Sequence, residues 1–584
     1  MLSTLARRLD LQADEMRLAV TLGGILFAIT SSYTLVKTAR DVLFLAQLPA
    51  TTLPYVYLGV GLVTLVVSVL VGRLTHRVRT AETLAGTALV SAVVLAGFAW
   101  LARQDREWIA VAFYVWVNLY GLILVSQFWA FTNSVSHPGE AKRIFGIIGG
   151  GGILGGLVGG IVAGRVGSGV GVHWLVVVGA VLVGLTVPGV YTGLRRGTVP
   201  EPEAVPEDGG GETRPWKVRY VRWLGLAALC SVLVTGLLDY QLKVELQTRY
   251  PSRAQLASFF GLFYTVMNLA ALTFQMFGTR VLLQRLGAGW SAAVLPMGLG
   301  AGAAVTMIVP GFTSVLGTRL WDQVTRLSLN KSATELFYFP LEPGLRRRAK
   351  ALIEAGLERT GDALAGLLIL GLTVSLGAST WTIASLVVVL VLVWIAAWFG
   401  VRRGYVKELG RNLRRMNLDP TQARISLREA SLRGEMLRLL QSPYERVVLH
   451  GIAMLEENDP RALRRQLPPL LNHASSAVRA RALALAAVMD PESTRTRIRE
   501  LIEDPDPLVR VEALRAQAAL GEGHPTEALE QLAGEPDPKL RTAALQSLFE
   551  LAPATEEERR RHDEANLRRE IRLAQPDALQ RIRG

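Results

Sequence analysis

The residues that could do chemistry in this 584-residue chain are charged side chains inside long apolar runs. In the first such run, Lys37 and Asp41 stand four residues apart with Arg40 beside them. In the seventh run, Asp239 and Lys243 have the same spacing. A charge inside an apolar helix costs several kcal/mol unless it is paired or hydrated. Opposite charges in these places are typical of gates, or of a site that holds an ionic substrate.

Two later apolar runs carry whole stripes of charge. The tenth run has Arg319, Asp322 and Arg326 on one helical face, followed by Lys331 and Glu335. The eleventh run has a charged residue at every fourth position, namely Lys350, Glu354, Glu358 and Asp362. Arg359 lies to one side of this stripe. Such stripes cannot face lipid. For Lys350 and Glu354 we favour an ion-pair latch between the two halves of the protein, and for Arg359 a substrate or gating role.

No pattern of an enzyme or of a metal site is present in the sequence. The seven His residues lack metal-ligand spacing, and the only cysteine, Cys230, lies in an apolar run. The glycine-rich stretch 149–160 follows no predicted strand and leads to no Gly-Lys-Ser or Gly-Lys-Thr. Small residues at every fourth position instead favour close packing of membrane helices. We therefore expect no catalytic residue, no metal and no cofactor.

The composition indicates a membrane protein. Half of the residues are apolar, 19% are charged and the mean hydropathy is positive. The net charge of +14 raises the question of nucleic acid, but the excess Arg and Lys before residue 400 lies in short loops between apolar runs. That placement orients helices in a bilayer and argues against nucleic acid as a partner.

The apolar runs predict twelve transmembrane helices, since each is about the length that a bilayer requires. They begin near Leu18, Leu53, Leu84, Trp108, Ile144, Val172, Val221, Leu256, Trp290, Gly311, Ala349 and Thr380. The tenth and eleventh are the least apolar because of their charges. Basic loops on one side place both termini in the cytoplasm of a cell, and we expect a bacterial inner membrane.

A Pro-, Gly- and acid-rich stretch divides the membrane part into six plus six helices. We expect an N-terminal bundle over 1–195, a cytoplasmic linker over 196–220 and a C-terminal bundle over 221–403. Two six-helix halves are the plan of major-facilitator transporters. The predicted fold class is all-α: a polytopic membrane protein with twelve helices in two bundles, followed by a cytoplasmic helical-repeat domain.

The C-terminal part has a strict period of 31 residues. Apolar residues recur at Val447, Val478, Val509 and Leu540, and small residues recur four positions later. Arg follows the apolar position in three units. These units resemble HEAT repeats, which stack into an α-solenoid. We expect a connecting helical segment over 404–435, repeats over 436–552 and a charged tail over 553–584, with a role in docking on a protein partner or on the chain's own membrane part, or a stabilising role.

Several segments of the membrane part resemble the ATP/ADP translocase family of plastids and intracellular bacteria. They are "SYTLVKTARDVL" (32–43), "FWAFTN" (128–133), "EAKRIF" (140–145), "LLDYQLKVEL" (237–246), "SATELFYFPL" (332–341) and "LERTGDAL" (357–364). The resemblance implies a major-facilitator-like carrier that exchanges nucleotides across a membrane without hydrolysing them.

The resemblance also implies roles for individual residues. The family's basic residue before the first-helix Asp falls on Arg40, its seventh-helix acid and following Lys on Asp239 and Lys243, and its basic residue in the eleventh helix on Arg359. The fourth helix departs from the family, because Asn118 stands where the family has Glu before an aromatic residue and Gly. This loss of a carboxylate and the added repeats indicate a divergent branch with its own substrate.

Three functional hypotheses follow. The first is an alternating-access carrier for a nucleotide or other phosphorylated anion, in which Lys37, Arg40 and Arg359 attract the anion and Asp239 is a charge partner or gate. The second is a carrier of an anionic lipid. The third is a non-transporting membrane scaffold or sensor whose repeats recruit a cytoplasmic protein. The expected partners are the lipid bilayer, an anionic small molecule or lipid, and that protein.

Overall fold

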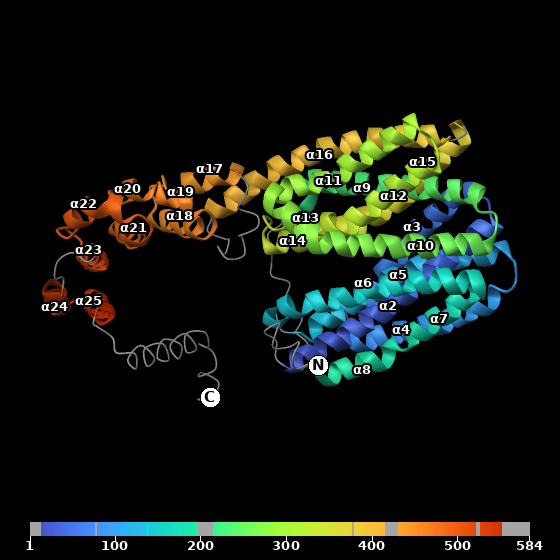
Figure 1. The fold of residues 1–584 in the computed structure, drawn as a ribbon, viewed down its shortest axis with the longest axis horizontal. Helices are drawn as coiled ribbons and strands as arrows, with labels where there is room; N and C mark the ends of the chain where they lie inside the picture. Colours follow the sequence, from blue (N-terminus) through green and yellow to red (C-terminus); the bar gives the residue numbers. More distant parts are fainter. Residues whose placement is uncertain are drawn as a thin grey trace. The chain divides into compact units, whose positions relative to one another are not determined.

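The computed structural model describes residues 13–75, 79–136, 138–196, 214–376, 379–414, 430–520 and 526–551. The described residues form helices and contain no strand. The chain divides into two compact units, Met1–Leu409 and Gly410–Gly584, which we call the membrane unit and the repeat unit (Figure 1).

The membrane unit consists of two successive groups of helices. The first group is α2 (Ala13–Gln47), η1 (Ala50–Thr52), α3 (Leu53–Thr75), α4 (Thr80–Leu101), α5 (Glu107–Ser134), α6 (Pro138–Gly169), α7 (Val172–Gly184) and α8 (Thr186–Arg196). The second is η2 (Pro215–Lys217), α9 (Arg219–Arg249), α10 (Arg253–Thr273), η3 (Phe274–Thr279), α11 (Arg280–Ile308), α12 (Phe312–Thr325), η4 (Arg326–Asn330), α13 (Lys331–Tyr338), α14 (Pro343–Lys350), η5 (Ala351–Leu357), α15 (Glu358–Leu376) and α16 (Thr380–Arg414). We call these groups the first half and the second half.

The predicted all-α membrane fold is confirmed. Among the described residues, ten helices are long and apolar enough to cross a membrane. The other two predicted runs, the tenth and the eleventh, are also helical but are not among these ten, and the apolar part of the eleventh is a shorter helix, Thr360–Thr373. Each contains a stretch of π-helix, η4 in the tenth and η5 in the eleventh. Such stretches are frequent at functional sites.

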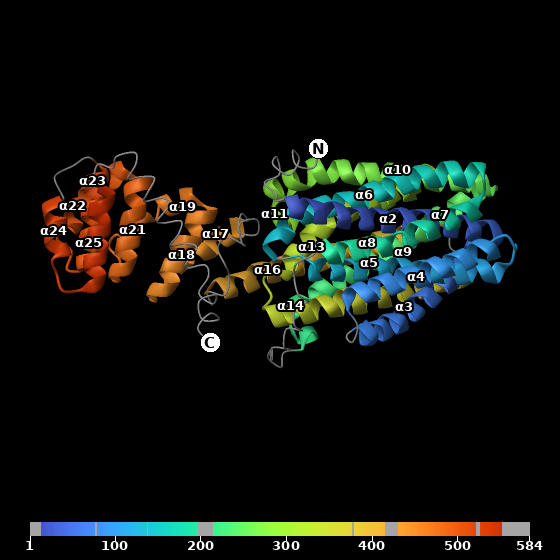
Figure 2. The same ribbon diagram turned by 90° about the horizontal axis from the view of Figure 1, so that it is seen from below.

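Glycines bring helices of the two halves into close contact along two seams. In one seam α6 packs against α10, where a Cβ atom at Gly261 would collide with the backbone of Gly164 (Figure 2). In the other seam α3 packs against α15, where a Cβ atom at Gly61 would lie 2.6 Å from the Cβ of Ala363. Small residues let membrane helices approach closely and gain dispersion energy. Within the glycine-rich stretch 149–160, a Cβ atom at Gly160 would lie 2.8 Å from the backbone nitrogen of Thr265 in α10, which is consistent with the predicted role in packing.

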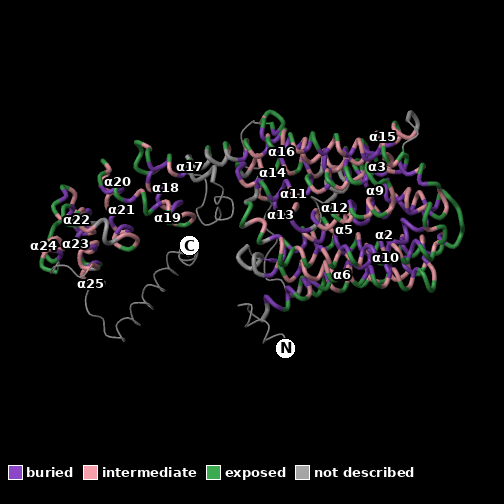
Figure 3. Tube along the Cα trace, turned by 45° about the horizontal axis from the view of Figure 1, so that its top comes forward, coloured by how far each residue is buried: buried purple, intermediate pink, exposed green. Residues whose placement is uncertain are grey.

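The outer surface of the membrane unit is apolar. Val93, Leu262 and Leu392 are each more than 60% exposed, and Figure 3 shows exposed residues mainly around the outside of the helix bundle. A soluble protein rarely exposes large apolar side chains over such an area. The surface is therefore suited to lipid.

The repeat unit contains nine described helices: α17 (Ala430–Leu439), α18 (Glu445–Asn458), α19 (Pro460–Arg464), α20 (Leu467–Leu470), α21 (Ser476–Met489), α22 (Pro491–Leu501), α23 (Pro507–Ala519), α24 (Thr526–Ala533) and α25 (Pro538–Leu551). The 31-residue period marks buried positions, since Val478, Val509 and Leu540 are fully buried. In the first repeat the buried residue is Val448 rather than the predicted Val447.

The recurring Arg of the repeats has a structural role. Arg479, Arg510 and Arg541 each donate a hydrogen bond to the carbonyl oxygen six residues earlier, at distances of 2.9, 3.1 and 3.3 Å. Each Arg thereby ties the turn before its helix to the helix itself. Arg479 also forms an ion pair with Asp504 of the next repeat at 2.7 Å.

The α6–α10 seam yields a first prediction. Gly261→Ala forces the two helices apart, and overpacking of this kind costs about 1–3 kcal/mol. We expect a lower melting temperature of the detergent-purified protein. Gly149→Ala in α6 is the matched control, because a Cβ atom there meets nothing within 4 Å. Equal melting temperatures of the two variants would contradict the close approach.

The Arg479–Asp504 pair yields a prediction on pH. Burial opposes ionisation of Asp504, but hydrogen bonds from Arg479 outweigh it and hold the pKa of this carboxyl below its usual value. The pair therefore stabilises the folded state above the unfolded pKa of about 3.9, and this contribution is lost as the pH falls through the lower folded value.

Amide hydrogen exchange in α21 and α23, corrected for intrinsic rates, should show that protection falls below about pH 4. Arg479→Gln should lower protection at neutral pH and flatten this dependence. The control Arg481→Gln breaks only an exposed pair with Glu456 and should change little. An unchanged pH profile in Arg479→Gln would refute the assignment.

Candidate functional site

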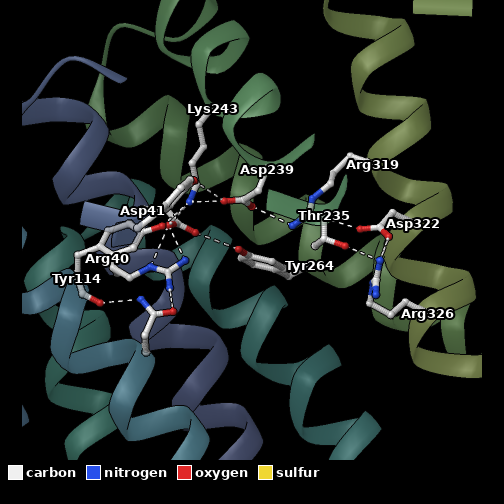
Figure 4. A network of polar contacts seen from close by, with 12 residues as sticks. Arg40, Asp41, Tyr114, Thr235, Asp239, Lys243, Tyr264, Arg319, Asp322 and Arg326 are labelled. Carbon is white, nitrogen blue, oxygen red and sulfur yellow. Dashed lines mark hydrogen bonds and ion pairs between the residues drawn. The ribbon is translucent and has the colours of Figure 1, made fainter. Parts of the chain in front are cut away.

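Seven charged side chains inside the membrane unit form one continuous row in which cations and carboxylates alternate. In order along the row they are Arg40, Asp41, Lys243, Asp239, Arg319, Asp322 and Arg326 (Figure 4). They come from α2, α9, α12 and η4, so the row runs from the first half into the second.

The row crosses between the halves at the ion pair of Asp41 with Lys243. The Arg40 Nη2 atom lies 2.7 Å from Asp41 Oδ1, and both residues belong to α2. The Lys243 Nζ atom of α9 lies 3.2 Å from the same Asp41 oxygen and 2.8 Å from Asp239 Oδ2 one helical turn earlier. Lys243 is only 2% exposed. The ion pair of Lys243 with Asp41 thus brings α2 and α9 into contact through charge.

The row continues through the tenth predicted helix. Arg319 Nη2 lies 2.9 Å from Asp239 Oδ1, while its Nη1 lies 2.6 Å from Asp322 Oδ2. Arg326 then donates hydrogen bonds to Asp322 Oδ1 from Nε at 3.1 Å and from Nη2 at 2.7 Å. Because Asp322 has no exposed surface, its charge depends on these two Arg residues.

Three Tyr residues from other helices complete the polar contacts of the row. Tyr264 of α10 donates to Asp41 Oδ2 at 3.1 Å, and Tyr57 of α3 donates to Asp239 Oδ2 at 2.8 Å. Tyr114 of α5 accepts a hydrogen bond from Lys243 Nζ at 2.7 Å. The sequence does not single out these residues, because a Tyr in an apolar run contributes to hydropathy like any aromatic residue. The available signal was the hydroxyl, which needs a partner when it is buried.

Both ends of the row are cations that have a single carboxylate partner among the described contacts. At one end, Arg40 Nη1 donates to the neutral Asn118 Oδ1 at 3.2 Å, and its guanidinium lies 4.3 Å from the centre of the Tyr114 ring. At the other end, Arg326 donates to the hydroxyls of Ser231, at 2.7 Å, and Thr235. Four cations thus share three carboxylates.

Lys37 adds a further positive charge beside the row. Its Nζ lies 4.7 Å from the centre of the Tyr264 ring, an arrangement typical of a cation–π contact. The described part of the site therefore holds more positive than negative charge. Such a site favours an anion, because buried charge of one sign is costly until a counter-charge arrives.

The structure brings together six of the seven predicted site residues: Lys37, Arg40, Asp41, Asn118, Asp239 and Lys243. Arg359 lies in α15, and its side chain is outside the described part of the structure.

The predicted latch between the two halves involved Lys350 and Glu354. Lys350 pairs with Glu335 at 2.7 Å and with Glu354 at 3.8 Å, and all three belong to the second half. These two pairs of Lys350 therefore lie within the second half and do not join the halves.

A cavity of about 960 Å³ lies between the two halves, beside the Arg326 end of the row. Its walls come from α4 and α5 of the first half and from the second-half elements α9, α11, η4, α13, α14, η5, α15 and α16. Arg326 and Ser231 are part of the wall, together with Gln127, Trp129 and Asn330. The cavity reaches α9 near its N-terminal end.

At the C-terminal end of α9 the two halves are in direct contact. Gln247 Nε2 donates to the carbonyl oxygens of Leu45 and Leu48 at 2.8 Å each, and Gln247 Oε1 accepts from the Ala50 amide at 2.7 Å. Arg253 forms an ion pair with Asp105 at 2.6 Å on the same side. Along α9 the order is therefore cavity, charged row and closed contact.

Comparisons with known proteins agree with this architecture. Residues 79–178 match the TLC ATP/ADP transporter family model, and residues 465–548 match HEAT repeats. The chain is 23% identical over 356 residues to ADP,ATP carrier protein 1 of Chlamydia muridarum, which covers 53% of this chain and 67% of that one. It is 25% identical over 335 residues to the chloroplastic ADP,ATP carrier protein 1 of Arabidopsis thaliana, and there it spans about half of the relative's length (53%).

Among solved structures, the nucleoside transporter NupG is 11% identical in sequence, with a TM-score of 0.49. The alignment covers 68% of this chain and 99% of the NupG chain. The sequence comparisons confirm the predicted resemblance to ATP/ADP translocases, the HEAT repeats and the absence of an enzyme function, because the relatives are carriers. This chain is thus an integral membrane protein that is similar to the ADP/ATP carriers, with a region that matches the TLC ATP/ADP transporter family and C-terminal HEAT repeats.

Proposed function

We propose that the membrane unit transports a nucleotide or another phosphorylated anion by alternating access. The observation that carries the proposal is the charged row, which joins the two halves, has more cations than carboxylates and ends at Arg326 in the cavity wall. The names of the relatives, ADP,ATP carrier proteins, support a nucleotide as the first substrate to test.

Transport rather than a static scaffold is supported by the two ends of α9. A scaffold would have no need of a cavity between the halves, whereas a carrier needs a site that is open to one side and closed to the other. The cavity near the start of α9 and the Gln247 contacts near its end fit a carrier open toward one side. We propose that this open side is cytoplasmic, in a bacterial inner membrane with both termini inside, because the basic loops lie there.

The substrate class follows from the charge balance around Arg40. Asn118 gives Arg40 a neutral amide partner, where the family pattern would give a carboxylate. The charged row is therefore more positive by one charge than it would be with a carboxylate at position 118, and it attracts an anion more strongly. A substrate with a compact, high negative charge, such as a phosphorylated solute, is favoured over a neutral nucleoside.

We propose that the HEAT repeats serve for docking or regulation on the cytoplasmic side. Each repeat buries its apolar face against its neighbours, while charged side chains such as Arg481, which pairs with Glu456, lie at the surface. Solenoid surfaces of this kind typically bind other proteins.

Ligand binding tests the substrate class. ADP or ATP should raise the melting temperature of the purified full chain, whereas adenosine should not, because it lacks the negative charge. Asn118→Asp should reduce the shift, since the added carboxylate neutralises Arg40, and the neutral exchange Asn118→Gln is the control. No shift at millimolar nucleotide would sink the nucleotide version, and a shift caused only by phosphatidylglycerol would favour the anionic-lipid hypothesis instead.

Cross-linking tests alternating access. Cysteines at Leu48 and Gln247, in a Cys230→Ser background, can be joined by a short thiol-specific linker because the two residues are in contact. The linked protein should lose uptake of labelled ADP into proteoliposomes yet still bind ADP, since the cavity lies at the other end of α9. Each single-cysteine variant treated with the same reagent is the control. Undiminished uptake by the linked protein would rule out opening at this contact.

A further inference from the structure

Arg326 is the point at which the charged row meets the cavity. Its side chain is 24% exposed and forms part of the cavity wall, while its partner Asp322 has no exposed surface. An anion in the cavity can therefore reach the guanidinium of Arg326 without meeting the carboxylate of Asp322 first. A guanidinium binds phosphate through two parallel hydrogen bonds, a geometry that an ammonium group cannot offer.

The other groups around Arg326 suit an anion as well. Ser231 and Thr235 lie one helical turn apart on α9, and their hydroxyls both accept hydrogen bonds from Arg326. A hydroxyl can rotate and donate its hydrogen to an incoming oxygen. Ser231 and Asn330 line the same cavity. Arg326 and these hydroxyls form an anion subsite in which Asp322 is the described carboxylate partner of Arg326. The wall of the same cavity also contains Glu335, Glu354 and Glu358.

On the basis of the transport function proposed above, we propose that the anionic group of the solute binds Arg326 together with Ser231 and Thr235, and replaces Asp322 as the charge partner of Arg326. The site takes a phosphate or a group of similar charge and size. The anion thereby becomes the next negative charge in a row that already alternates in sign.

This exchange of partners has a consequence for the rest of the row. When Arg326 turns to the anion, Asp322 retains only Arg319, and Arg319 is drawn from Asp239 toward Asp322. Asp239 then depends on Lys243, which is shared with Asp41 of the first half. At 3.2 Å, the Lys243–Asp41 pair is the longest ion pair of the row, and it is the one that joins α2 to α9. Binding at Arg326 thus weakens the charge contact between the halves.

Coupling of this kind is reciprocal, because a ligand that favours the loosened row must bind more tightly when the row is loosened by other means. Asp322 competes with the anion for Arg326. Replacing Asp322 should therefore strengthen anion binding, even though the replacement removes a buried ion pair. A purely structural role of Asp322 predicts the opposite, since damage to the fold would weaken binding. The sign of the change separates the two explanations.

The test is anion affinity of the full-length protein, purified in detergent, measured by isothermal titration with ADP and, separately, with inorganic phosphate. Arg326→Gln should weaken binding of both probes by roughly tenfold or more, because a hydrogen-bonded charge is lost. Arg326→Lys, which retains the charge and a partner for Asp322, should weaken it by a smaller factor. Asp322→Asn should bind both probes more tightly than wild type, despite a lower melting temperature.

Lys350→Gln is the matched control, because Lys350 is another cation of the same cavity wall, paired with Glu335. Its binding should fall far less than that of Arg326→Gln, because Lys350 is not part of the subsite. Equal losses in Lys350→Gln and Arg326→Gln would indicate attraction by the general positive field and overturn the subsite, as would weaker binding in a folded Asp322→Asn. If the wild-type protein binds the probes and the Arg326 variants bind them equally well, the subsite is overturned but the proposed function is not. If the wild-type protein binds neither probe, the proposed function is contradicted.

Discussion

Ionised side chains in the interior of a membrane protein must meet counter-charges, and this requirement organises the membrane unit. Lipid and apolar side chains cannot solvate an isolated Arg, Lys or Asp, so every such group depends on neighbours for its stability. The chain meets the requirement by alternation: each of the three carboxylates of the row lies between two cations. As a consequence, no charged residue of the row can change its ion-pair partner without disturbing the neighbouring ion pair.

The helical framework makes this chain of dependence possible. Glycines in α6 and α3 bring the halves close enough for Lys243 of α9 to reach Asp41 of α2. The π-helical stretch η4 begins at Arg326, one turn after Asp322, where the row meets the cavity. Tyr57, Tyr114 and Tyr264 contribute hydroxyls from three further helices. Close packing, helix irregularity and charge pairing therefore act on the same few residues.

Much of this arrangement is readable from the sequence, for identifiable reasons. Charges inside apolar runs are conspicuous, and the spacing of Asp239 and Lys243 already places them on one helical face. The 31-residue period predicts the repeats, because buried positions in stacked units must recur. The ion-pair partners of these charges on other helices could not be predicted, because the spacing of residues within one helix does not show which helix packs against it. Lys350 illustrates this: its stripe suggested a link between the halves, but its ion pairs lie within the second half.

Entry of an anion from the cavity into the charged row at Arg326 is the step on which the proposed transport depends. An experimental structure of the full-length protein with a phosphorylated solute bound tests this step most directly. We expect a phosphoryl group within hydrogen-bonding distance of Arg326 and Ser231, with Asp322 turned toward Arg319. A phosphoryl group bound elsewhere, with the Arg326–Asp322 pair intact, would contradict it.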